Sequence, residues 1–284
     1  MHRIGFNLLP WSATVSEALY PHIERIRDIG YDGIEYSMGA QDAAAYRGLG
    51  AFLADLDMAC SSCLALAPEH NPASSDPAVR QQGLEKIKWA IDRAVDTGAD
   101  VICGPFHSAF AWFTKAAPTP DEAKWSAEVL RQAGEYAEQA GVMLALEALN
   151  RFECYLCNTM QQLVELTEMV DHPFVQVMFD THHSNIEEKS FAGAIRTAAP
   201  HLVHVHISEN DRGTPGDGVV AWKEVFDTLS EVGYKGWLTI ESFTRADPDF
   251  ANAINVWRSF SEPWDIAEQG YAFIKRQLCE TAPG

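Results

Sequence analysis

Eight short β-rich segments alternate with eight longer segments of helical periodicity along this 284-residue chain. An alternation of this kind is typical of α/β proteins with a parallel sheet. Eight such units, in a chain close to the usual size of about 250 residues, predict a closed (β/α)8 TIM barrel. The expected strands are Ile4–Leu8, Gly33–Tyr36, Met58–Leu66, Val101–Cys103, Met143–Glu147, Val175–Asp180, Leu202–Ile207 and Trp237–Glu241. The expected helices are Val15–Ile29, Gln41–Leu56, Ala78–Thr97, Asp121–Gln139, Met160–Val170, Phe191–Ala198, Val220–Val232 and Ile266–Leu278.

Capping residues support these boundaries. Asp121 and Thr159 are expected at helix N-caps. A doubly wound open sheet is the alternative fold, but no G-x-G-x-x-G motif follows the first strand. No linker divides the chain, so residues 1–284 are expected to form a single domain. Glycines follow four of the helical segments, as is common at helix C-termini: Gly30, Gly98, Gly141 and Gly233.

Four long segments without helical or strand periodicity each follow an expected strand. They cover residues 104–120, 182–189, 209–218 and 243–264. In a parallel barrel, such segments lie at the catalytic end. Their Trp, Phe and His content favours a substrate pocket over disorder.

Four possible metal ligands stand near the C-terminal ends of four successive expected strands. They are Glu147, Asp180, His206 and Glu241, each separated from the next by about one strand-plus-helix unit. The C-terminal ends of barrel strands share one face, where barrel active sites are built. Three carboxylates and one imidazole suit Mn²⁺, with Mg²⁺ or Co²⁺ as alternatives, better than a structural zinc. The sequence therefore predicts a metal site at this face.

Each of these side chains also has an ordinary structural interpretation. Glu147, and still more Glu153 in its loop, would serve as a capping or solvated glutamate. Asp180 would cap the next helix, although two adjacent histidines make that less persuasive. His204 and His206 point the same way because strand side chains alternate, and His206 is nearer the strand end. Arg212 would form a surface salt bridge, or donate to a hydroxyl or an oxyanion. The coincidence of four ligands at four strand ends favours the metal site.

Charge and composition exclude several classes of function. The formal net charge is −19, and such a field repels nucleic acid and anionic membranes. No apolar run approaches the length of a membrane span, and the N-terminus lacks a signal-peptide pattern, so a cytoplasmic location is expected. The C-x-x-C pairs Cys60/Cys63 and Cys154/Cys157 invite a zinc or redox interpretation. We favour buried thiols, because Cys60 and Cys63 would point to opposite faces of a strand.

Several motifs together resemble the D-tagatose/D-psicose (ketose) 3-epimerase family of xylose isomerase-like sugar isomerase/epimerase barrels. They are L-E-A-L-N-R-F-E (146–153), F-D-T-x-H-x-N-I-E-E (179–188), H-V-H-I-S-E-N-D-R-G-x-P-G-x-G (204–218) and I-E-S-F (240–243). The resemblance covers nearly the whole chain and includes G-P-F-H (104–107) and V-W-R (256–258).

The resemblance implies roles for particular residues. Glu147, Asp180, His206 and Glu241 would hold the divalent metal, and Glu147 and Glu241 would also be the acid/base pair. Contacts to the sugar's O1–O3 end would come from Glu153, His183 and Arg212. A homodimer or homotetramer acting on a small-molecule sugar is the expected assembly.

The chain departs from the family pattern in the expected pocket wall. The loop after G-P-F-H reads Ser108-Ala-Phe-Ala-Trp-Phe-Thr-Lys115, the usual E-P-F reads Glu241-Ser-Phe243, and strand two ends in Glu35-Tyr-Ser-Met-Gly39. These departures leave the sugar unidentified. Aromatic side chains that would either stack on the sugar or lie in the core are Phe6, Trp11, Phe106, Trp112 and Trp257; we assign Phe6 and Trp112 to the substrate.

The chemistry agrees with these roles. Inverting a carbon beside a ketone through a cis-enediolate needs a base on one face and an acid on the other, and a divalent cation that acidifies the C–H bond. The same site would also serve an aldose–ketose isomerase, an inosose dehydratase or an enzyme acting on 3-keto-glycosides. A nuclease of the endonuclease IV type would need a basic groove, which the charge opposes. A non-catalytic binding module would tolerate Glu241→Gln.

Overall fold

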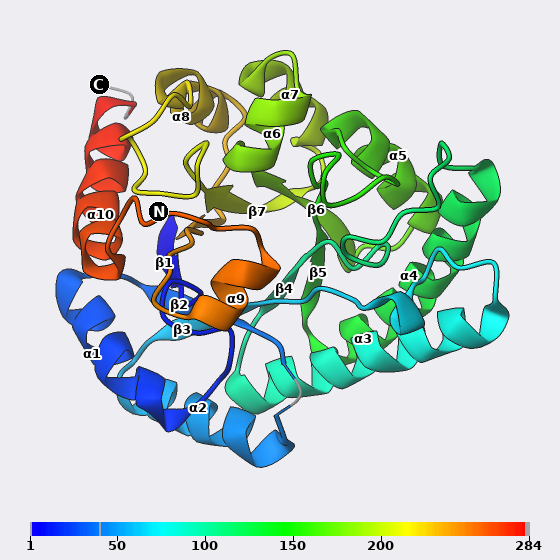
Figure 1. Ribbon diagram of the computed structural model, residues 1–284, viewed down its shortest axis with the longest axis horizontal. Helices are drawn as coiled ribbons and strands as arrows, with labels where there is room; N and C mark the ends of the chain where they lie inside the picture. Colours follow the sequence, from blue (N-terminus) through cyan, green and yellow to red (C-terminus); the bar gives the residue numbers. More distant parts are fainter. Residues whose placement is uncertain (1, 40, 282–284) are drawn as a thin grey trace.

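Eight parallel strands pair in chain order and close into a barrel, with β8 paired to β1. The computed structural model describes residues 2–39 and 41–281. Figure 1 shows the helices arranged as a ring around the barrel. The predicted TIM barrel is confirmed, and the doubly wound alternative is wrong. The strands are β1 (Arg3–Asn7), β2 (Gly33–Ser37), β3 (Ala59–Cys63), β4 (Val101–Gly104), β5 (Met143–Leu146), β6 (Val175–Asp180), β7 (Leu202–Ile207) and β8 (Trp237–Ile240).

Eight of the helices correspond to the predicted ones, and two more lie in segments expected to be irregular. The two additional helices, α6 and α9, have only seven and six residues, too few to reveal a helical period in the sequence. Short 3₁₀ turns occur at Glu17–Leu19 and Pro68–His70. The helices are α1 (Tyr20–Ile29), α2 (Ala43–Asp55), α3 (Pro77–Thr97), α4 (Pro120–Ala140), α5 (Met160–Val170), α6 (Thr181–Glu187), α7 (Phe191–Ala198), α8 (Trp222–Glu231), α9 (Pro248–Ala253) and α10 (Pro263–Glu280).

Helix caps confirm most of the predicted boundaries. Thr159 caps α5 as predicted. The expectation for Asp121 is wrong, because Pro120 takes the first helical position and Thr119 is the N-cap of α4. Thr119 forms a capping box with Glu122, whose side chain bonds back to the Thr119 backbone. The glycines predicted to follow helices all have positive φ: Gly30, Gly98, Gly141 and Gly233.

Alternation along the strands creates two separate apolar regions. Outward side chains such as Phe6, Ile34 and Ile240 are fully buried in a large core between the strands and the helices. Inward side chains fill the barrel itself, so the barrel is a packed interior and not a pore. This second cluster consists of Val101, Cys103, Ala145, Met178 and Trp237.

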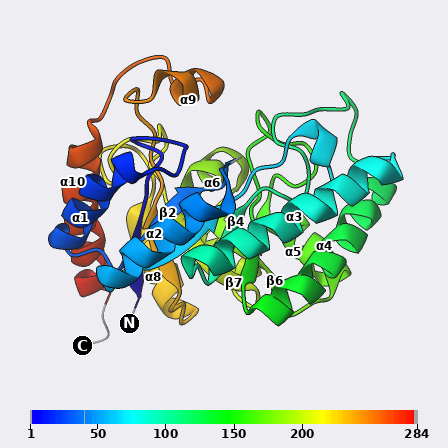
Figure 2. The ribbon, with the colours of Figure 1, turned by 90° about the horizontal axis from the view of Figure 1, so that it is seen from below.

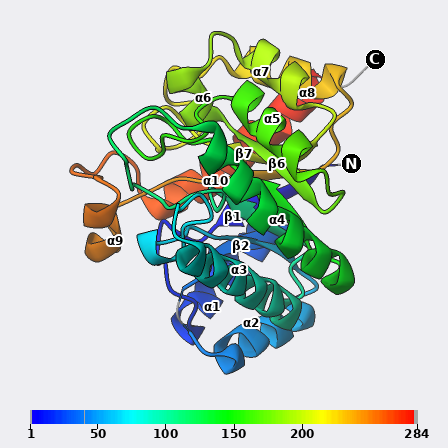
Figure 3. The same ribbon diagram turned by 90° about the vertical axis from the view of Figure 1, so that its right-hand side faces the viewer.

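The two ends of the barrel differ. Figures 2 and 3 show α9 standing out from one end, while β1 begins and α10 ends toward the other. The loops that follow the strands therefore gather on the α9 side. Among residues 2–39 and 41–281, no helix combines the length and the apolar character that a membrane crossing requires.

The close fit of Trp237 inside the barrel generates a stability prediction. At Gly33 a Cβ atom would stand 2.3 Å from the backbone oxygen of Ala59 and 2.7 Å from the Trp237 ring. We expect Gly33→Ala to lower the free energy of unfolding by about 1–3 kcal/mol, because the methyl group overpacks the interior. Denaturant titration measures this change. The control is Gly48→Ala in α2, where the new Cβ meets only Tyr20 Oη at 3.4 Å; this helical substitution should be neutral or slightly stabilising. A Gly33→Ala variant as stable as the wild type would contradict this packing.

Candidate active site

The four predicted ligands converge at one mouth of the barrel. Glu147 follows β5, Asp180 ends β6, His206 lies in β7 and Glu241 follows β8. All four are buried, and one donor atom from each lies within 4.8 Å of the others. The cause is the parallel register, in which Asp180 pairs directly with His206 across β6 and β7.

Asp180 caps a helix as considered from the sequence, and it also faces the cluster of predicted ligands. Its Oδ1 accepts hydrogen bonds from the backbone N–H groups of His182 (2.6 Å) and His183 (3.3 Å), so it caps α6. Its Oδ2 faces the cluster, where it accepts from Ser208 Oγ at 3.2 Å and Arg212 Nη1 at 2.8 Å. The capping interpretation and the site interpretation are therefore compatible, because each uses a different oxygen.

The two imidazoles of β7 both point into the barrel, as strand alternation predicted. The rings of His204 and His206 lie 5.2 Å apart and both contact the carboxylate of Glu35. His206 Nε2 is 2.8 Å from Glu35 Oε1. His206 Nδ1 is turned the other way, 3.3 Å from Glu241 Oε2 and 3.5 Å from Asp180 Oδ2.

Arg212 supplies the positive charge of the site. Its Nη1 donates at 2.8 Å both to Asp180 Oδ2 and to Glu241 Oε2. Its Nη2 lies 2.9 Å from His183 Nε2. The residue has φ of 64°, a left-handed conformation that favours glycine, and its side chain is buried. The surface salt bridge considered for Arg212 is therefore excluded.

Crowding of acidic groups perturbs their ionisation. Burial and the neighbouring Glu241 carboxylate raise the pKa of Glu147 well above its ordinary value. For Asp180, burial alone would raise the pKa, but Arg212 and His183 hold that pKa well below its usual range. One guanidinium thus balances part of the negative charge, and Glu147 still repels Glu241.

Two buried atoms of the cluster have no hydrogen-bond partner among the described residues. They are Glu147 Oε1 and His206 Nδ1. Buried polar atoms are nearly always paired, so unpaired atoms that face one point need a further partner. Three carboxylates and one imidazole are donors that suit a hard or borderline divalent cation. The residues present therefore fit a divalent metal ion.

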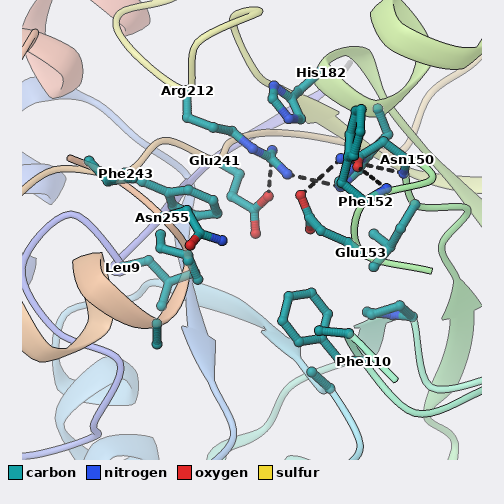
Figure 4. A pocket seen from close by; sticks show the side chains of 18 of the residues that line it. Leu9, Phe110, Asn150, Phe152, Glu153, His182, Arg212, Glu241, Phe243 and Asn255 are labelled. Atoms are coloured by element: carbon teal, nitrogen blue, oxygen red, sulfur yellow. Dashed lines mark hydrogen bonds and ion pairs between the residues drawn. The ribbon is translucent and has the colours of Figure 1, made fainter. Parts of the chain in front are cut away.

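A cavity of about 860 Å³ opens above the cluster. Figure 4 shows Arg212, Glu241 and Glu153 pointing toward one another across it. Residues 253–258, at and after the end of α9, form much of one wall, and sequence periodicity gave no sign of this helix. Apolar side chains supply most of the remaining lining, among them Leu9, Leu64, Phe110, Phe152, Phe243 and Phe250.

Glu153 and His183, the two further polar residues expected to contact substrate, also line this cavity. His183 Nε2 lies 3.5 Å from Glu147 Oε1. Asn150 Nδ2 donates to Glu153 Oε1 at 2.8 Å, and the Asn150 backbone N–H donates to His183 Nδ1 at 3.2 Å. Asn150 therefore holds both residues in place, a role that its position in the sequence did not indicate.

The structure does not bring the two expected substrate aromatics to the cavity lining. Phe6 is fully buried and packs against Trp11 and Tyr31, because in β1 it is Gly5 and Asn7 that point into the barrel. Trp112 is 38% exposed beside Tyr155 and lies outside the lining.

Of the other three aromatic residues considered, two belong to the core and one lines the cavity. Phe106 is fully buried in the core, and Trp11 is a partly buried residue at the edge of the same core. Trp257 lines the cavity and is 68% exposed. Glu35, expected to alter the pocket wall, instead lies below the ligands with no exposed surface. The sequence did contain a sign of this burial, because Glu35 is the one charged residue of its strand and occupies an inward position.

Comparisons with known proteins agree with this architecture. The sequence model of the family described as "Xylose isomerase-like TIM barrel" matches residues 23–276. A D-psicose 3-epimerase of Ruminiclostridium cellulolyticum is 38% identical over 198 residues, which cover 69% of this chain and 68% of that protein. An L-ribulose 3-epimerase of Mesorhizobium japonicum is 33% identical over 286 residues, covering 99% of this chain and 96% of the relative.

Similarity of structure points the same way. The crystal structure of a D-allulose 3-epimerase from Methylomonas sp. in complex with D-allulose superposes with a TM-score of 0.91 and 28% identity, covering 97% of each chain. The chain therefore belongs to the ketose 3-epimerase group of the xylose isomerase-like TIM barrel family.

Proposed function

We propose that this protein is a divalent-metal-dependent epimerase that inverts C3 of a free ketose through a cis-enediolate. The observation that carries the proposal is the buried cluster of Glu147, Asp180, His206 and Glu241, with two unpaired donor atoms facing its centre. The relatives that bear the names D-psicose 3-epimerase and L-ribulose 3-epimerase support the choice of a ketose. We propose Mn²⁺ as the ion, with Mg²⁺ or Co²⁺ as alternatives.

Glu147 and Glu241 are the proposed acid/base pair. They follow β5 and β8, on different sides of the barrel mouth, so their carboxylates approach a bound sugar from different directions. A divalent ion bound to the four ligands would acidify the C–H bond beside the sugar's carbonyl. One carboxylate takes the proton from one face of C3, and the other carboxylic acid delivers a proton to the opposite face.

Arg212, His183 and Glu153 are the proposed contacts to the O1–O3 end of the sugar. Arg212 is charged and buried beside Glu241, so it can donate to an oxygen that gains negative charge. Glu153 lies across the cavity and accepts hydrogen bonds, as a sugar hydroxyl requires. These groups orient the ketose while the apolar wall excludes water.

A 3-keto-glycoside is a second candidate substrate, and cavity size is the observation that favours it. The cavity of about 860 Å³ lies near the upper end of the range of roughly 300–1,000 Å³ that is usual for ligands of drug size. A free ketose would leave part of this volume open. A glycoside would place its aglycone against the apolar side chains of the wall.

We further propose that the protein is a homodimer or homotetramer. Exposed apolar side chains gather beside the mouth, where Trp112 and Phe113 are 38% and 37% exposed and Phe152 is 73% exposed. Apolar groups of this size beside a binding site are typical of surfaces that a partner covers. Light scattering with size-exclusion chromatography determines the assembly.

Proton exchange tests the acid/base pair. In D₂O, the Mn²⁺-loaded protein should incorporate deuterium at C3 of D-fructose, D-tagatose or L-ribulose and form the C3 epimer. Glu147→Gln and Glu241→Gln should each lower kcat about 10²–10⁴-fold at saturating Mn²⁺, because each removes one proton carrier. Mass spectrometry and NMR measure the exchange.

Glu122→Gln, which alters a buried carboxylate outside the cavity lining, is the matched control and should retain kcat. Wild-type protein that exchanges no ketose proton would refute the proposal.

Metal removal tests the ion independently of substrate. Chelation should abolish epimerisation, and Mn²⁺ should restore it. A ligand that binds only the folded state at about 100 times its Kd stabilises that state by about 2.7 kcal/mol, so chelation should also lower Tm. Calorimetric unfolding with and without Mn²⁺ measures the shift. Full activity and an unchanged Tm after exhaustive chelation would contradict a metal-dependent enzyme.

Substrate choice separates the two candidates. We expect kcat/KM to be higher for a free ketose than for a methyl 3-keto-glucoside, because the polar contacts converge on a small region beside the ligands. Coupled NMR assays of both compounds measure the ratio. A ratio in favour of the glycoside would select the second candidate and leave the metal chemistry intact.

A further inference from the structure

Glu35 is a carboxylate with no exposed surface, placed in β2 below the four-ligand cluster. A buried charge is costly unless hydrogen bonds satisfy it. Asn7 Nδ2 and His206 Nε2 each lie 2.8 Å from its Oε1. Its Oε2 accepts from Ser61 Oγ at 2.8 Å and from Cys103 Sγ at 3.2 Å. Both oxygens are therefore fully used inside the protein.

Glu35 takes no part in the pocket. It is absent from the cavity lining, so it does not touch a substrate there. Its contact with the site passes through His206, whose ring stands between Glu35 and the carboxylates of Asp180 and Glu241.

The hydrogen bond to Glu35 determines which nitrogen of His206 carries the proton. A carboxylate only accepts, so the His206 nitrogen that faces it, Nε2, must carry hydrogen. In a neutral imidazole the other nitrogen then has the free lone pair. That nitrogen is Nδ1, which faces Asp180 and Glu241 and has no hydrogen-bond partner in the part of the chain that the structure describes.

We propose that Glu35 is a positioning residue that holds His206 in the Nε2–H tautomer and so presents the Nδ1 lone pair to the divalent ion. The inference rests on the proposed function for the presence of the ion. A carboxylate behind a ligating histidine fixes the orientation of the ring and raises its donor strength.

A second metal site in the lower cluster is the competing interpretation. Donor atoms of Glu35, Cys63, Cys103 and His206 also lie within 4.8 Å of one another. These atoms, however, are already joined by hydrogen bonds, including Cys63 Sγ to Glu35 Oε1 at 3.3 Å and a Cys63–Cys103 contact at 3.2 Å. The upper cluster differs because two of its atoms, Glu147 Oε1 and His206 Nδ1, find no hydrogen-bond partner among the residues described. The hydrogen-bonded network therefore favours a supporting role for the lower cluster.

Titration with Co²⁺ tests the proposal without any measurement of catalysis. We expect Glu35→Gln to raise the Kd for Co²⁺ about 10–100-fold and to change the ligand-field absorption of the bound ion, since the carboxylate behind the imidazole is lost. The matched control is Glu122→Gln, which alters a buried carboxylate that contacts Thr119 and Tyr155 and no proposed ligand. A role of Glu35 in stability alone would lower Tm and leave the Kd and the spectrum of the folded protein unchanged.

The outcomes of this titration are distinguishable. A Kd and a spectrum equal to those of the wild type would overturn the role of Glu35. Two Co²⁺ ions per chain, with a thiolate charge-transfer band, would overturn it in favour of the lower metal site. Absence of Co²⁺ binding to the wild type would refute the proposed function itself.

A second measurement on the wild type does not depend on the folding of a variant. Long-range ¹H–¹⁵N NMR of the Mg²⁺-loaded protein identifies the protonated nitrogen of each histidine. The His206 signal is assigned by its absence in His206→Gln. We expect hydrogen on Nε2 of His206, and hydrogen on Nδ1 would overturn the proposal.

Discussion

Mutual repulsion of buried carboxylates at the barrel mouth is the constraint on which the rest of the site depends. Glu147, Asp180 and Glu241 come from three strand ends, and at close range their charges oppose folding. The structure offsets this repulsion in two ways. Arg212 adopts a left-handed backbone conformation and donates to Asp180 and Glu241. Asp180 directs its second oxygen to the start of α6. Glu147 Oε1 still lacks a hydrogen-bond partner among residues 2–39 and 41–281, and the proposed cation would supply one.

The barrel interior changes from apolar to polar side chains, layer by layer, toward this mouth. Trp237 and its apolar neighbours fill the lower part. A layer of hydrogen bonds to Glu35 follows, and one of these bonds holds the ring of His206 from below. The ligands and the apolar-walled cavity lie above it. Each layer supports the next, and the four candidate ligands lie within strands or directly after strand ends, where the rigid barrel positions them.

The sequence predicts those features of the fold and the site that neighbouring residues encode, and it misses those that depend on contacts between distant residues. The eight strands and eight main helices have clear periods and end signals, and strand alternation placed His204 and His206 on one face. Helix α9 is too short to have a period, although it forms a cavity wall. Strand-end positions and the family resemblance both indicated the four candidate ligands. The side to which Phe6 points, however, depends on a one-residue register. Arg212 and Glu35 act through long-range contacts that no local pattern records.

Anomalous diffraction from crystals soaked in Mn²⁺ tests the central claim most directly, because it locates the ion without reference to activity. The account predicts a single strong peak per chain, bonded to carboxylate oxygens of Glu147, Asp180 and Glu241 and to Nδ1 of His206. A peak at the thiols of Cys63 and Cys103, or no peak at the barrel mouth at full soak, would contradict it.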